Sequence, residues 1–121
     1  MNTIIYHNPK CSKSCYALEY LEKHNIDKEV RLYLKRGVTR AVIFDILELL
    51  NVNISDVLRE KEQVFVAQYS STGIVLSKEG IVNAIIKNPI LLQRPIILLK
   101  EKGVGVVARS KEILDRFFTK H

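Results

Sequence analysis

The chain has 121 residues, of which 47% are hydrophobic and 26% are charged. These values are ordinary for a globular protein, and the length predicts one domain with its own core. No apolar run is long enough to span a membrane, and the first residues lack a secretory signal. We therefore expect no membrane attachment and a cytoplasmic location.

The charge balance is basic, with 19 lysines and arginines against 13 acidic residues and a net charge of +6. These cations are spread along the chain with few aromatic neighbours, so we do not expect nucleic-acid binding. A small oxyanion is compatible with this charge. The three histidines, His7, His24 and His121, lack the spacing of zinc ligands, and no metal is expected.

The first third of the chain reads as strand, helix and strand. Residues 3–6 are apolar and β-branched, which predicts a buried strand. Apolar residues recur at helical spacing over 14–24, and Ser12 or Ser14 can cap that helix. Residues 29–34 alternate like a second strand. This strand should be parallel to the first, because a helix separates them.

The middle of the chain is predicted to be helical. Thr39 can cap a helix with a broad apolar face, and residues 51–60 predict a short further helix. Residues 61–77 favour helix or loop. Ser77 can cap another helix, which the Asn88-Pro89 pair ends.

The last third predicts a hairpin and a closing helix. Residues 96–99 form an apolar strand, a turn follows at 101–103, and residues 104–107 supply an antiparallel partner. Ser110 then caps a helix with a buried stripe. The order β-α-β, helices, β-β-α predicts an α/β protein with a thioredoxin-like mixed sheet. We expect one domain over residues 1–121, with a helical insert at about 39–90 between its two halves.

The segment Tyr6-His7-Asn8-Pro9-Lys10-Cys11-Ser12-Lys13-Ser14-Cys15 carries the strongest chemical signal. Cys11 lies in a strand-to-helix loop, at the positive end of the helix dipole and between two lysines. This environment favours the thiolate, which is the nucleophilic form of cysteine. Two cysteines without a secretory signal favour a catalytic thiol in a reducing compartment. The alternative is a small cysteine buried in a turn.

Several motifs together resemble one family. The loop His7-Asn8-Pro9-Lys10-Cys11 is similar to the active-site loop of the glutaredoxin-coupled arsenate reductases. Residues 88–96, NPILLQRPI, resemble that family's second motif, and residues 57–60, VLRE, resemble its middle segment. Arg109 fits a further family arginine. The related Spx-type regulators usually carry a second cysteine where Ser14 stands, so this loop resembles the monothiol reductases.

The resemblance implies an activity. Cys11 would attack arsenate to form a thiol-linked arsenic adduct, and glutathione, as co-substrate, would complete reduction to arsenite with glutaredoxin. No metal or bound organic cofactor is implied. Arg59, Arg94 and Arg109 would bind the oxyanion and stabilise the thiolate, a task that suits the planar guanidinium fork. Pro95 would follow a cis peptide bond and face the thiol.

The supporting residues have alternatives. His7 would either help set the protonation of Cys11 or hold the loop by a hydrogen bond, with Ser14 beside it. Each arginine has an ordinary alternative role as a structural or solvated cation. Cys15 stands where the family usually has arginine. Because it falls on the predicted apolar stripe of the helix, we expect it to pack in the core rather than bond to Cys11.

Two other functions stay open from the sequence. One is an Spx-like regulator that binds RNA polymerase, and the missing second cysteine of the loop weighs against it. The other is a thiol oxidoreductase of the same fold that acts on a substrate other than arsenate.

Overall fold

The computed structural model describes residues 2–121, and within them a four-stranded sheet has the order β2-β1-β3-β4. The strands are β1 (Thr3–Tyr6), β2 (Glu29–Arg31), β3 (Ile96–Leu99) and β4 (Val104–Val107). Strand β1 is parallel to β2 and antiparallel to β3, and β3 is antiparallel to β4. The predicted thioredoxin-like mixed sheet is therefore confirmed.

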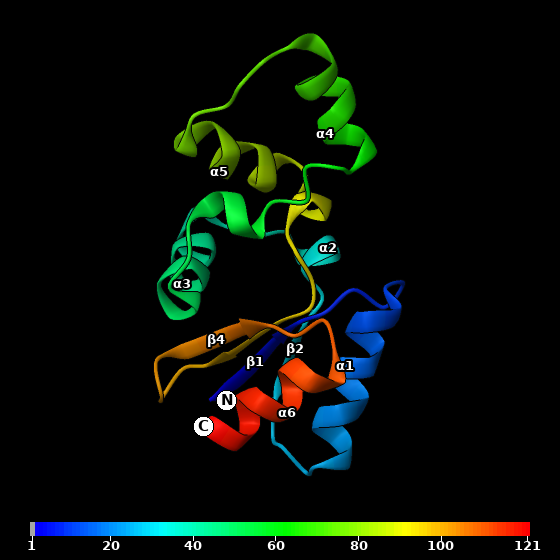
Figure 1. The fold of residues 1–121 in the computed structure, drawn as a ribbon, viewed down its shortest axis with the longest axis vertical. Helices are drawn as coiled ribbons and strands as arrows, with labels where there is room; N and C mark the ends of the chain where they lie inside the picture. Colours follow the sequence, from blue (N-terminus) through cyan, green and yellow to red (C-terminus); the bar gives the residue numbers. More distant parts are fainter. Residues whose placement is uncertain (1) are drawn as a thin grey trace.

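Helices cover both faces of this sheet, as Figure 1 shows. Helices α1 (Ser12–Lys23) and α6 (Lys111–Lys120) pack on one face, and α3 (Arg40–Leu50) packs on the other. Successive side chains of a strand point to opposite faces, so each strand contributes to both cores. The alternation is clear in β1, where Ile5 packs with α1 and α6 while Ile4 and Tyr6 join the opposite cluster.

The segment between β2 and β3 is mainly helical. It contains α2 (Tyr33–Arg36), α3, α4 (Gln63–Gln68) and α5 (Lys78–Lys87), with 3-10 turns at Ile54–Val57, Ser70–Thr72 and Pro89–Leu91. The preference for helix or loop over 61–77 is confirmed. In Figure 1, α4 and α5 lie beyond one end of the sheet. No helix in the described residues is long and apolar enough to cross a membrane.

Three predicted helix caps are confirmed. The side chains of Thr39, Ser77 and Ser110 each accept a hydrogen bond from the backbone N–H three residues later. These bonds satisfy amide groups that a helix start leaves without an intrahelical partner. They place the starts of α3, α5 and α6 where the sequence predicts them.

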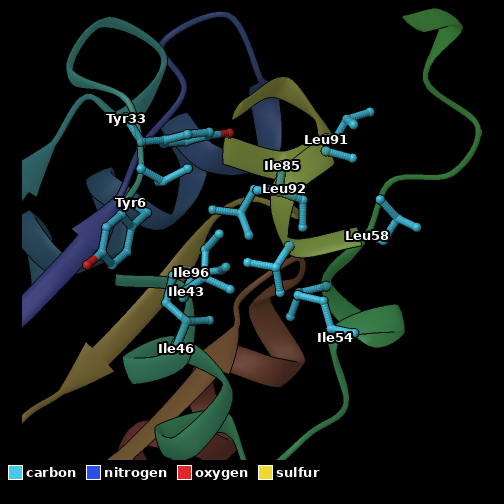
Figure 2. Close-up of a cluster of buried hydrophobic side chains, with 14 of the residues drawn as sticks. Tyr6, Tyr33, Ile43, Ile46, Ile54, Leu58, Ile85, Leu91, Leu92 and Ile96 are labelled. Atoms are coloured by element: carbon cyan, nitrogen blue, oxygen red, sulfur yellow. The ribbon is translucent and has the colours of Figure 1, made fainter. Parts of the chain in front are cut away.

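The larger core joins the helical segment to the sheet, as Figure 2 shows. Its fully buried members come from β3, α2, α3, α5 and the turns beside them: Tyr33, Ile43, Ile46, Val57, Ile85, Leu91, Leu92, Ile96 and Leu98. Apolar burial of this extent is the main favourable term in folding. The turns at 54–57 and 89–91 are held in place because they belong to this core.

The prediction of a strand over 29–34 is wrong in its second half. Strand β2 ends at Arg31, and Tyr33 begins the short helix α2. The Tyr33 side chain is 1% exposed and packs in the larger core, whereas Val30 and Leu34 are exposed. Burying this ring beyond the end of the sheet outweighs a weak alternating pattern on an edge strand.

Candidate active site

One end of the sheet brings three distant segments together. Tyr6, at the end of β1, is paired with Ile96, and Ile96 is paired with Val107, at the end of β4. The Cys11 loop therefore leaves the sheet beside the Arg94-Pro95 pair, and Arg109 follows on the other side. The backbone N–H of Ala108 donates to the carbonyl of Pro95 at 2.9 Å. The Arg94-Pro95 peptide bond is cis, as predicted.

A short backbone ladder adds Arg59 to this end of the sheet. Leu58 forms an antiparallel bridge with Leu92. The N–H of Arg59 donates to the carbonyl of Leu91 at 2.7 Å, and the N–H of Gln93 donates to that of Val57 at 2.8 Å. The chain segments that carry Arg59 and Arg94 therefore run side by side. Resemblance alone had grouped these arginines, and the ladder is the physical cause of their proximity.

Cys11 is the N-cap residue of α1, with an extended backbone and a half-buried side chain. Burial by itself raises the pKa of the thiol. The backbone N–H groups of Ser14 and Lys13 and the Arg94 guanidinium outweigh burial, so the pKa of Cys11 lies below its ordinary value. Amides and cations that stabilise a thiolate in this way are typical of reactive cysteines.

The expected capping role of Ser12 or Ser14 is wrong. Helix α1 begins at Ser12, and within the described residues its N-cap has no side-chain hydrogen bond. Ser14 is instead fully buried, and its hydroxyl lies 2.6 Å from His7 Nδ1 and accepts the N–H of Asn8 at 3.0 Å. These two bonds hold the loop against the first turn of the helix. His7 and Asn8 are themselves buried, so their polar groups need such a partner.

His7 is buried beside this serine, and burial lowers the pKa of its imidazole. A neutral ring can accept a hydrogen bond from the Ser14 hydroxyl at Nδ1, while the Ser14 oxygen accepts one from the backbone N–H of Asn8. The backbone N–H of His7 also donates to the carbonyl of Arg31 at 2.9 Å, which ties the loop to β2. This geometry supports the loop-holding alternative for His7.

Each of the three arginines contacts a polar group at this end of the sheet. Arg109 Nη1 donates to the carbonyl of Arg94 at 2.8 Å, and Arg59 Nη1 lies 3.5 Å from Gln93 Oε1. Arg94 Nη1 also donates to the carbonyl of Ile90 at 3.3 Å. The Arg94 Nε atom is buried and has no hydrogen-bond partner within residues 2–121.

A cleft of about 630 Å³ opens beside the arginines. Its lining includes Arg59, Glu62, Gln93 and Arg109, and Cys11 does not belong to it. A second hollow, over the first turn of α1, is lined by Ser12, Lys13, Tyr16, Arg109, Ser110 and Lys111. Arg109 lines both hollows, so it stands between the cleft and the helix start that carries Cys11.

Cys15 does not pack in the core as expected. It is half-buried, and its thiol donates to the carbonyl of Pro9 at 3.2 Å. The buried stripe of α1 consists of Ser14, Ala17, Tyr20 and Leu21. It is rotated about the helix axis by one residue from the predicted stripe, so Cys15 lies at its edge. Neither Cys11 nor Cys15 forms a disulfide in the described part of the chain.

A model described as the ArsC family matches residues 6–116. The chain belongs to the ArsC family. It is 35% identical over 100 residues to the uncharacterised protein YfgD of Escherichia coli, a match that covers 82% of this chain and 83% of that protein. It is 34% identical over 115 residues to an arsenate reductase of Neisseria meningitidis serogroup A, covering 92% and 93%.

Solved structures agree with the ArsC assignment. The structure of an arsenate reductase from Vibrio cholerae matches with a TM-score of 0.84 and 29% identity, covering 95% of this chain and 97% of that one. The likeness extends over the sheet, the covering helices and the helical segment between β2 and β3. Membership of the ArsC family, which the loop and the arginine motifs predicted, is confirmed, and coupling to glutaredoxin stays a prediction.

Sequence reasoning missed two residues of this candidate site. Glu62 Oε2 lies 3.0 Å from Arg59 Nε and 3.5 Å from Arg94 Nη1. Tyr33 is buried near both Cys11 and Arg94, and burial raises the pKa of its phenol to about 12. Glu62, three residues after Arg59, had a detectable signal as an i,i+3 charge pair. Tyr33 had none, because its position depends on the end of β2.

Proposed function

We propose that this chain is a thiol-dependent arsenate reductase that works with glutathione and glutaredoxin. The observation that carries the proposal is the convergence of a Cys11 thiol of lowered pKa with the guanidinium of Arg94, at the end of the sheet where Arg59 and Arg109 also lie. Family membership and arsenate reductase relatives at 30% identity or more support it.

The first step requires a thiolate and a neutralised oxyanion. The Cys11 thiolate attacks arsenic, an S–As bond forms, and one As–O bond breaks, with the oxygen leaving as water after protonation. Two negative species approach each other in this step, so cations must offset their repulsion. Guanidinium groups are suited to this because they donate paired hydrogen bonds to neighbouring oxygens. We assign this role to Arg59, Arg94 and Arg109.

The second step is a reduction by external thiols. A glutathione thiolate attacks the Cys11 sulfur, and the S–As electron pair stays on arsenic, which leaves as arsenite. Cys11 is left as a mixed disulfide with glutathione, and a glutaredoxin thiol then reduces that disulfide. Arsenic gains two electrons, and two thiol sulfurs lose them. These co-reactants are kept reduced in the cytosol, so we also propose a cytoplasmic location.

Release of arsenite tests this proposal. The purified chain, glutathione and glutaredoxin should release arsenite from arsenate, and Cys11→Ser should abolish release because the nucleophile is lost. Cys15→Ser is the matched control and should retain turnover. Arsenite is measured directly, so that oxidation of glutathione alone is not counted.

Assays that omit or replace one reductant test whether the reaction depends on glutaredoxin. Loss of turnover when glutaredoxin is omitted supports the proposed partner, and full turnover with thioredoxin in its place would contradict it. Equal arsenite release by the wild type and Cys11→Ser would overturn the proposal as a whole.

A further inference from the structure

Glu62 occupies a position that the mechanism above does not use. Its Oε2 atom contacts the guanidinium groups of Arg59 and Arg94 at 3.0 and 3.5 Å. The side chains are 23% exposed for Arg59, 13% for Arg94 and 22% for Glu62. One carboxylate oxygen therefore bridges two of the three cations to which we assign oxyanion binding.

Electrostatic repulsion explains what this contact does. In the resting site, the Glu62 carboxylate occupies donors of both Arg59 and Arg94. Arg109 and Lys61 add positive charge to the same cleft, which two further carboxylates also line. A dianion entering beside an intact Glu62 bridge would meet a negative group at the donors that it needs. Movement of Glu62 away from the arginines removes this repulsion and frees those donors.

The local structure allows such a movement. Glu62 lines the open cleft and is the N-cap residue of the six-residue helix α4. Its backbone is fixed, because its N–H donates to the carbonyl of Arg59 at 3.1 Å and its carbonyl accepts from Phe65 and Val66. In the part of the chain that is described, the side chain bonds to these two arginines alone. Rotation of the side chain into the cleft would free both guanidinium groups.

We infer that Glu62 is an internal competitor for the oxyanion, whose carboxylate an incoming dianion must displace from Arg59 and Arg94. This rests on the proposed function and names the group that regulates access to its binding site. A ligand's apparent affinity is reduced by the fraction of protein in the competing state. Glu62 thereby lowers the apparent affinity of the site for oxyanions.

Calorimetric titration of arsenate tests the inference in a Cys11→Ser background, which binds without reacting. Adding Glu62→Gln keeps the side-chain shape and removes its charge, so the arsenate Kd should fall at least about fivefold. Glu60→Gln is the matched control, because Glu60 is exposed, lines the same cleft and carries the same charge. It should change Kd by less than about twofold, because the Glu60 carboxylate pairs with neither arginine in the described residues and an exposed charge is screened by salt.

An unchanged or higher Kd in the Glu62→Gln variant overturns the inference, and a higher Kd would show that Glu62 holds the arginines in their binding positions. Thermal melts of each variant verify that the compared proteins are folded. The inference and the proposed reaction can be overturned independently. If the wild type releases arsenite but Glu62→Gln leaves the arsenate Kd unchanged, only the inference is overturned. Tighter binding without arsenite release by the wild type supports the inference and overturns the proposed reaction.

Discussion

At the scale of the residue, the environment of Cys11 determines how readily its thiol ionises. Its sulfur is half-buried, a setting that alone opposes ionisation. The N–H groups of the first turn of α1 and the Arg94 guanidinium reverse that effect. The cation comes from a segment more than eighty positions away, whereas the amides come from the helix that Cys11 caps.

We predict that Cys11 ionises below the range of a free cysteine. In a Cys15→Ser background, the rate of iodoacetamide alkylation should rise with pH and reach half its maximum below about 8.5. The direction follows from the lowered pKa, because the thiolate is already populated at a pH where an ordinary thiol is protonated. Cys11→Ser, which leaves Cys15, is the control. A midpoint of about 8.5 or higher in the first variant would contradict the prediction.

At the scale of the element, the junction of β1 and α1 is held by a buried hydroxyl. Ser14 Oγ connects His7 and Asn8 to the first turn of the helix, and Lys10 N–H donates to Asn8 Oδ1 at 3.0 Å. The loop is thus fastened at both ends while Cys11 stays accessible between them. A rigid loop of this kind keeps a nucleophile in place.

We predict that Ser14→Ala destabilises the fold by about 1–3 kcal/mol, because it leaves two buried polar groups unpaired. Those groups are His7 Nδ1 and the Asn8 N–H. Urea unfolding followed by circular dichroism measures the change. Ser12→Ala, at an exposed position of the same turn, should stay within about 0.5 kcal/mol. Equal unfolding midpoints for the two variants would show that the Ser14 hydroxyl is dispensable.

At the scale of the whole molecule, the helical segment is joined to the sheet through α3 and β4. Gly105 makes this approach possible, because a Cβ atom there would lie 2.6 Å from Leu50 Cδ1 and 2.6 Å from Leu98 Cδ2. The carbonyl of Ile97 would lie 3.1 Å away. A Cβ atom at position 105 would therefore be too close both to α3 and to β3 of the sheet.

We predict that Gly105→Ala lowers the free energy of unfolding by about 1–3 kcal/mol through overpacking. Gly80→Ala is the comparison, since its Cβ would lie 3.3 Å from the flexible Leu76 side chain and should change stability by less than about 1 kcal/mol. Denaturant unfolding measures both. A Gly105→Ala variant as stable as the wild type would mean that the helix and the sheet adjust without cost.

The local pattern of residues was sufficient for most of the elements. Apolar runs predicted β1, β3 and β4, and hydroxyl residues predicted the starts of three helices, because strand burial and capping depend on near neighbours. The loop and arginine motifs predicted the family. The position of Cys11 at a helix start predicted a nucleophile, and the family resemblance predicted the three arginines as oxyanion ligands; both roles stay predictions.

Tertiary structure alone decided the features that depend on distant contacts. The end of β2 is set by burial of Tyr33, and the role of Ser14 is set by the buried groups around it. The contact of Glu62 with Arg94 exists because the Leu58–Leu92 bridge brings two segments side by side. Long-range pairing and packing of this kind have no local pattern, since each partner alone is compatible with many positions.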